Sequence, residues 1–230
     1  MTQLIKGDAY ILRTCNADMT SHNGFTWPKS GIVEAPDWRD DDKCRGGLHG
    51  FLWGYGCGTL ADWSDNAVWI VARVTEWIDL GGKVKFPRAE VVFCGSRFDA
   101  TSRIIELGAV GAVIGAYVSS GDYGTSTSGY SGTSISGYRG TSISGYRGTS
   151  ISGAYGTSTS GHSGTSISGA YGTSTSGALG VASSGKNGTI IIKYYDDDIS
   201  RIAVGYIRDG GIKPDTQYMV VGGEFVEVSK

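Results

Sequence analysis

The chain has 230 residues, of which 38 are glycine, more than twice the roughly 7% of an average protein. Its 20 Lys and Arg against 22 Asp and Glu leave a net charge of −2, with no positive excess for a nucleic-acid backbone or an anionic membrane surface. There is no apolar run of 18 residues, and four cysteines are too few for a disulfide scaffold. We therefore expect no secretory leader and a cytoplasmic protein.

Residues 1–107 are expected to form a small α+β domain. All six tryptophans and all four cysteines lie before residue 100, so the aromatic material for an ordinary packed core is concentrated there. Short runs rich in β-branched residues predict strands, and a longer run predicts one helix. The strands are expected at residues 10–14, 68–74 and 90–94, and the helix at residues 100–107.

Residues 108–188 contain an octapeptide repeat. Seven consecutive octads, the first beginning at Gly124, read G-T-S-[TI]-S-G-x-x without an insertion or deletion. A flexible linker has no physical reason to keep this phase, whereas a stacked structure must, because a slip of one residue turns every side chain to the other face. T-S-[TI]-S predicts a short strand, and G-x-x-G predicts a corner in which glycine adopts backbone angles closed to other residues.

Two octads are expected to make one coil of a two-sided β-solenoid. The phrase Tyr-Gly-Thr-Ser-Thr begins at Tyr123, Tyr155 and Tyr171, which are 32 and 16 residues apart. A repeat that stacks on its neighbours in this way predicts about four turns of about 16 residues, with neighbouring strands about 4.8 Å apart.

The pattern leaves two packings open, because Thr and [TI] share one side of each strand and the two serines share the other. Ile135, Ile151 and Ile167 can point inward as an aliphatic ladder, or the serines can point inward and pair their hydroxyl groups with one another and with the backbone. We favour inward isoleucines. The alternate octads carry a T-x-T array that lies either outward or inward: Thr125, Thr127, Thr157, Thr159, Thr173 and Thr175.

Residues 189–230 are expected to form a C-terminal β cap. Open solenoid ends expose unpaired strand edges that invite further stacking, so both ends need a cover. Residues 189–195 are expected to pair with the last coil, and residues 218–221 and 224–228 to form a hairpin through Gly222-Gly223. The N-terminal domain is expected to cover the other end.

The repeat resembles a known type. The units that begin at Ala154 and Ala170 read Ala-Tyr-Gly-Thr-Ser-Thr and are similar to the octads of bacterial ice-nucleation proteins. This resemblance implies a β-solenoid that can pair through its tyrosine ladder, and it makes an ice-binding-like repeat protein an alternative function.

The whole chain also resembles uncharacterised proteins of bacteriophages and bacteria. In these proteins a domain with a C-x-x-G-[LF]-H motif, here Cys44-x-x-Gly47-Leu48-His49, precedes Gly/Ser/Thr-rich repeats. The resemblance implies a phage or prophage setting, and it carries no activity over to this chain.

Five Cys and His side chains are candidate metal ligands. Four of them can in principle form a tetrahedral zinc site, but their spacings match no standard zinc module, so buried thiols and a hydrogen-bonded histidine are preferred and no metal or cofactor is predicted. The candidates are Cys15, His22, Cys44, His49 and Cys57.

Two catalytic arrangements are open alternatives. Cys44 or Cys57 with His49 is the pair that a hydrolase needs, because an imidazole activates a thiol within hydrogen-bond reach. Arg13, His49 and Glu90 instead offer a base and two ionic groups for a transferase. Sequence order alone supports both, so we favour a protein without catalytic activity.

The favoured hypothesis is a protein-interaction module. Tyrosine and arginine are enriched at protein-contact hot spots, and both occur at the solenoid corners. The module is expected to inhibit a host protein or to form a homodimer; alternatively, the corner tyrosines only stack on each other and stiffen the rod. The corner residues are Tyr130, Tyr138, Arg139, Tyr146, Arg147, Tyr155, His162 and Tyr171.

Overall fold

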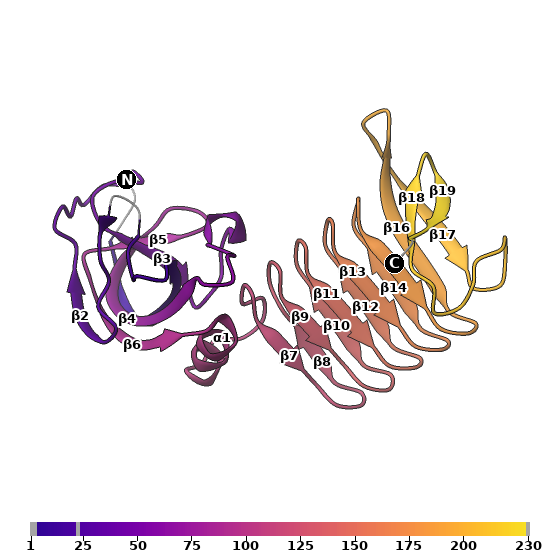
Figure 1. Cartoon of the computed structure of the whole chain (residues 1–230), viewed down its shortest axis with the longest axis horizontal. Coiled ribbons are helices and arrows are strands. Elements are labelled where there is room, and N and C mark those ends of the chain that lie inside the picture. Colours follow the sequence, from indigo (N-terminus) through magenta and orange to yellow (C-terminus); the bar gives the residue numbers. More distant parts are fainter. Residues whose placement is uncertain (1–3, 22–23, 229–230) are drawn as a thin grey trace. The chain divides into compact units, whose positions relative to one another are not determined.

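The structure is a computed structural model that describes residues 4–21 and 24–228 (Figure 1). The chain divides into two compact units, Met1–Ile114 and Gly115–Lys230, and strands dominate both. The mainly β fold with a solenoid of 16-residue coils is therefore confirmed. The described residues contain no helix that is long and apolar enough to cross a membrane.

The first unit is built on an antiparallel sheet that closes on itself. Its strands are β1 (Ile5–Cys15), β2 (Gly31–Glu34), β3 (Leu48–Leu52), β4 (Val68–Asp79), β5 (Val84–Phe86) and β6 (Arg88–Gly95). β1 pairs with β3 and β4, and β5 pairs with the same two strands, so these four form a ring. β6 extends the sheet from β4, and β2 pairs with β6 at the edge.

The interior of this ring is an ordinary apolar core. Ile11, Ile70 and Phe86 come from three different strands and are fully buried, and the buried Trp27 belongs to the same cluster. Each such side chain contributes about 1.5–3 kcal/mol through the removal of apolar surface from water. The concentration of aromatic residues before residue 100 thus does mark a packed core.

One helix, α1 (Arg97–Glu106), packs on β1, β4 and β6. It begins three residues before the predicted start at residue 100. The Ser96 side chain accepts a hydrogen bond from the Asp99 backbone N–H at 3.2 Å and so caps the first turn. Ala100 and Ile104 lie one turn apart on the buried face.

The second unit is a two-sided parallel β-solenoid (Figure 1). Successive strands alternate between two sheets, and partners lie 16 residues apart, as in the pairing of Thr141 with Thr157 and of Thr157 with Thr173. One sheet contains β8 (Thr125–Thr127), β10 (Thr141–Ser144), β12 (Thr157–Ser160), β14 (Thr173–Ser176) and β16 (Thr189–Asp196). The other contains β7 (Tyr117–Ser119), β9 (Thr133–Ile135), β11 (Thr149–Ser152), β13 (Thr165–Ser168) and β15 (Val181–Ser184).

The solenoid has about five turns rather than the predicted four. The flanking strands β7 and β16 keep the 16-residue register although their sequences leave the repeat, as shown by the pairing of Ser174 with Ile190 and of Val118 with Ser134. Backbone pairing therefore continues past the segment in which the octad can be read.

The interior of the solenoid is made of serine, and the expectation of inward isoleucines is wrong. Both serines of every T-S-x-S strand are buried, whereas Ile135, Ile151 and Ile167 lie on the outward side and are partly exposed. Ser150 shows how the hydroxyl groups are satisfied. Its hydroxyl donates to the Thr159 carbonyl oxygen at 2.6 Å, and its Oγ lies 2.8 Å from Ser144 Oγ, whose hydroxyl can donate to it; both partners are on the opposite sheet. Ser134, Ser142 and Ser174 repeat this pattern.

The corner glycines are required for close approach rather than for unusual backbone angles. A Cβ atom on Gly161 would lie 2.8 Å from the carbonyl carbon of Gly145 in the preceding coil, and a Cβ on Gly148 would lie 2.6 Å from the Ser144 Cβ. The left-handed position falls instead on the second residue between the glycines, such as Arg139 (φ 52°) or Tyr155 (φ 57°). Glycine thus lets successive coils touch, and the strain sits on larger residues.

The C-terminal segment covers the last coil with the predicted hairpin and with a further antiparallel strand, residues 199–206, that was not predicted. β17 (Ile199–Tyr206) pairs along β16, and the hairpin of β18 (Tyr218–Val221) and β19 (Glu224–Glu227) pairs with β15 at Ala182. Here the core changes from serine to apolar residues, with Ile190, Ile192 and Tyr218 in one buried cluster. The change to antiparallel pairing ends the parallel stacking.

Substitution of Ser150 tests the serine core. Ser150→Val is expected to lower the free energy of unfolding by about 1–3 kcal/mol, because the added branch has no room and the hydroxyl is lost. Thr149→Val, on the outer side of the same strand, is expected to change it by less than about 0.5 kcal/mol. Denaturant unfolding of both variants measures the difference, and equal stability of the two would contradict an inward-facing serine.

Candidate functional sites

One face of the solenoid carries two parallel columns of side chains. The first column is threonine at every level: Thr125, Thr141, Thr157, Thr173 and Thr189. The second column contains Thr127, Ile143, Thr159, Thr175 and Ile191. All ten side chains are at least partly exposed, so the T-x-T array faces outward. The backbone spaces its members about 4.8 Å between strands and about 6.7 Å along each strand. We call this surface the threonine face.

The opposite sheet carries a different array. Its outward columns place Thr133, Thr149 and Thr165 beside an isoleucine at each of these levels, and the threonine column ends in Tyr117 and Val181. The two faces of the solenoid are thus unequal, since only one repeats the T-x-T pair.

The predicted corner residues gather on two edges, and within each edge the rings contact one another. On the first edge Tyr130 stacks on Tyr146 with centroids 5.2 Å apart, and Tyr146 stacks on His162 at 5.1 Å. The interplanar angles are 10° and 3°, because all three residues occupy the same position of the corner. The Arg147 guanidinium lies 5.7 Å from the Tyr146 ring centroid.

The second edge contains Tyr138, Arg139, Tyr155 and Tyr171. Tyr155 and Tyr171 occupy the same corner position and stack at 4.9 Å and 7°. Tyr138 occupies the preceding position and therefore meets Tyr155 edge-on, at 5.6 Å and 70°. The Arg139 guanidinium lies about as far from both rings, at 5.4 Å from Tyr138 and 5.5 Å from Tyr155.

In the first unit the structure brings Arg13 and His49 together but leaves Glu90 elsewhere. Arg13 Nη1 donates to the His49 carbonyl oxygen at 2.7 Å, and both residues line two cavities of about 410 and 440 Å³. Glu90 is exposed on β6 and lines a separate hollow with Arg73 and Arg88. The prediction that Arg13, His49 and Glu90 line one cleft is therefore wrong.

Cys44 lines the same two cavities as His49, whereas Cys57 lines neither. Burial, together with the positive charges of Lys83 and Arg13, lowers the pKa of His49 to about 4, so the imidazole is neutral near pH 7. A hydrogen bond to Thr59 lowers the pKa of the exposed Cys57 thiol. No hydrogen bond joins either thiol to the His49 ring in the described part of the chain, so the hydrolase pair stays a prediction.

The candidate metal ligands do not form a cluster among the residues that the structure describes. Cys15 is buried at the end of β1, and burial raises the pKa of its thiol. Cys44 is exposed in the loop before β3. Within residues 4–21 and 24–228, no three His, Cys, Asp or Glu side chains are placed to hold one metal ion. His22 lies outside the described residues.

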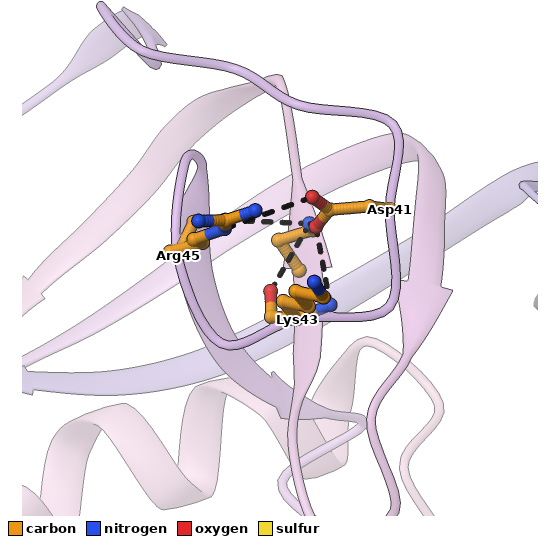
Figure 2. Close-up of polar contacts among 4 residues, drawn as sticks. Asp41, Lys43 and Arg45 are labelled. Carbon is orange, nitrogen blue, oxygen red and sulfur yellow. Dashed lines mark hydrogen bonds and ion pairs between the residues drawn. The ribbon is translucent and has the colours of Figure 1, made fainter.

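A buried lysine fastens the loop that borders these cavities. Lys85 on β5 is fully buried, which is rare for lysine. Its Nζ forms an ion pair with Asp41 Oδ1 at 2.8 Å and donates to the carbonyl oxygens of Lys43 and Arg45 at 3.2 and 3.4 Å (Figure 2). The hydrogen bond from Lys85 lowers the pKa of the Asp41 carboxyl. These contacts hold the loop that carries Cys44 against the sheet.

Sequence reasoning missed Lys85 and two members of the threonine face. A lone lysine between Val84 and Phe86 in an apolar strand was the available signal for a buried ion pair. Thr141 and Thr189 complete the first column, but their octads lack the second threonine and so fall outside the T-x-T pattern.

Comparison with known proteins gives different findings for different parts of the chain. Residues 9–104 match the family described as "Domain of unknown function (DUF7666)". The ice nucleation protein of Pseudomonas fluorescens is 41% identical over 98 residues, or 41% of this chain, and one of Pseudomonas syringae is 43% identical over 97 residues, or 40% of this chain. The ice nucleation protein InaU of Pantoea ananas is 39% identical over 99 residues, again 41% of this chain.

These matches support the resemblance of the octapeptide repeat to ice-nucleation repeats. They cover only 8%, 8% and 10% of the three proteins, so the chain spans about a tenth or less of the length of the curated relatives it matches. No solved structure matches the chain. The C-x-x-G-[LF]-H family and the phage setting stay predictions.

Removal of the Asp41 charge is expected to destabilise the first unit more than removal of the Asp8 charge. Asp41→Asn leaves the buried Lys85 ammonium with two carbonyl partners, whereas Asp8→Asn frees only the exposed Arg73. Because the folded pKa of Asp41 is lowered, its stabilisation is present above the ordinary pKa of an aspartate and is lost as pH falls through the lowered value. Thermal unfolding from pH 7 to pH 2 measures both effects, and an equal loss in the two variants would contradict the account.

Proposed function

We propose that the solenoid is an ice-binding module and that the threonine face is the surface that meets ice. The observation that carries the proposal is the unbroken column of five threonines beside a second column that is mostly threonine. The similarity of the repeat to that of proteins named for ice nucleation supports the same function.

The chemistry of threonine suits this surface. Each hydroxyl can hold one water molecule by a hydrogen bond, and the adjacent methyl group limits the directions from which other water molecules approach. Because the backbone repeats at a fixed spacing in two directions, the held water molecules are expected to repeat as well. An ordered layer of this kind can join the lattice of an ice crystal, whereas hydroxyl groups on mobile loops cannot.

The serine core supports the array. Hydrogen bonds between the sheets fix each strand against the one behind it, and the stacked corner rings fix successive coils. The threonine face extends over five strands, or about 20 Å. A patch this small is suited to binding an existing crystal surface, because a nucleus that forms on a template needs a larger area to become stable.

The threonine face is tested by matched charge substitutions. Thr157→Lys is expected to abolish most of the effect on ice, because a long charged side chain breaks the column at its middle level. Thr149→Lys lies at the equivalent position on the opposite sheet and is expected to leave the effect intact. Inhibition of ice recrystallisation and thermal hysteresis, which both report binding to an existing crystal, are the measurements. Equal loss in both variants, or an unmodified protein without effect on ice, would reject the proposal.

A second candidate function is self-association through the second edge. Tyr155 and Tyr171 stack in parallel and are 49% and 50% exposed, so they offer a regular aromatic strip to another copy of the chain. In the alternative, the tyrosine rings of the second edge serve only to stiffen the solenoid. The same ring stacking within the chain supports this alternative. Three expectations stay predictions: a host protein as partner, the phage setting and the cytoplasmic location.

Light scattering of the purified chain separates these alternatives. If the second edge mediates self-association, the chain is a dimer or larger and Tyr155→Ser with Tyr171→Ser makes it a monomer, whereas Tyr146→Ser on the first edge leaves the assembly unchanged. A monomeric unmodified chain would remove this candidate and leave the tyrosines as internal supports.

A further inference from the structure

The most unusual group in the first unit is the Arg13 guanidinium. Its Nε atom is inaccessible to solvent and has no hydrogen-bond partner, while Nη1 is occupied by the His49 carbonyl oxygen at 2.7 Å. Its guanidinium carbon lies 4.4 Å from the Trp27 ring centroid. Across residues 4–21 and 24–228, no carboxylate forms an ion pair with Arg13.

The known contacts recover only part of the hydration that this cation gives up. A ring face and one carbonyl oxygen stabilise a guanidinium less than a paired carboxylate does, and burial lowers the pKa of Arg13. The neighbouring Cys15 thiol does not supply the missing charge, because burial raises its pKa and keeps it neutral. The thiol contacts the guanidinium as a neutral hydrogen-bond partner, so the site holds a positive charge that lacks an anionic partner within the described chain.

This charge borders a cavity of a size that suits a small molecule. Arg13, Cys44 and His49 line both cavities, which measure about 410 and 440 Å³. Arg45 and Lys83 add positive charge, and the exposed Asp37 is the one carboxylate among the described lining residues. The balance of charge around the cavities is thus positive although the chain as a whole is slightly negative.

Two further features show how a ligand can be held. His49 Nε2 is buried without a hydrogen-bond partner, and the ring is neutral near pH 7, so it can donate one hydrogen bond. Phe25 and Trp27 line the larger apolar part of the first cavity, and their rings meet edge-on at 6.0 Å. The guanidinium and the aromatic rings therefore lie side by side in the wall of the first cavity.

We propose that this cavity binds a small organic carboxylate. The carboxylate pairs with the Arg13 guanidinium beside the His49 ring, and the apolar body of the ligand packs against the half-buried Phe25. A monoanion is favoured over a phosphate dianion because Arg13 is the lining cation that has an inaccessible N–H without a partner, whereas Arg45 is exposed to solvent. The site is independent of the threonine face, since all its residues belong to the first unit.

The test is a titration of the full chain with benzoate, followed by NMR of the Trp27 indole N–H and the His49 ring. Benzoate is expected to shift both signals, while the neutral isostere benzamide leaves them unchanged. Arg13→Gln is expected to weaken benzoate binding at least about tenfold, since a hydrogen bond to a charged group is lost. Arg73→Gln removes an equal charge that is already paired with Asp8 on the surface, and it is expected to leave the affinity unchanged.

A second readout covers the case in which Arg13→Gln does not fold. In the unmodified chain, bound benzoate is expected to raise the pKa of His49 above its value of about 4, because the anion stabilises the protonated ring. The absence of any shift with benzoate, equal shifts with benzamide, or equal weakening by Arg73→Gln would overturn the proposal. Tighter binding of phenyl phosphate than of benzoate would overturn the choice of a monoanion.

Discussion

The small volume between the two sheets of the solenoid is the constraint on which the rest of its structure depends. Each octad places two serines in this space, where hydroxyl groups such as that of Ser150 bond to a serine and a carbonyl oxygen of the facing sheet. Glycine at the corners lets the next coil approach so closely that even a Cβ would collide with it. Larger side chains therefore have to face outward, and this places Thr and Ile on the two surfaces. Surface chemistry here follows from what the interior excludes.

The 16-residue register also arranges the side chains on the outer surface of the solenoid in regular columns. Every residue type that recurs at one position becomes a column or a stack, which explains the threonine face and the parallel stacking of Tyr130, Tyr146 and His162. Where the position shifts by one residue, as at Tyr138, the rings meet edge-on. The solenoid is thus a scaffold in which a single substitution changes one level without moving the others. The first unit differs from it in kind, because it is held by an apolar core and by an ion pair between the buried Lys85 and the partly exposed Asp41.

The repeat made the solenoid and its coil length predictable, because phase over seven octads has only a stacked explanation. The C-terminal hairpin could be predicted from its Gly222-Gly223 turn, whereas the antiparallel strand β17 was not predicted. Hydrophobicity did not predict which side chains point into the solenoid. Serines fill the small interior, and Ile135 and its equivalents lie on the outer surface. The sequence analysis attributed the corner glycines to unusual backbone angles. The structure shows that glycine is needed there because successive coils are in close contact. In the first unit, Arg13 and His49 could be named as polar residues of interest, but their separation from Glu90 depends on which strands pair. Pairing between distant strands has no local signal, and for the same reason the bond from Lys85 to Asp41 was not foreseen.

The central claim is that the threonine face joins ice, and partition of the unmodified protein into slowly growing ice tests it most directly. A cooled probe grows ice in a dilute solution of the chain together with a protein of similar size that does not bind ice. The account predicts that this chain enters the ice at or above its concentration in the liquid while the reference protein is excluded. Exclusion of both proteins to the same degree would contradict the claim, and the columns of threonine would then be a consequence of the serine core without a role in binding ice.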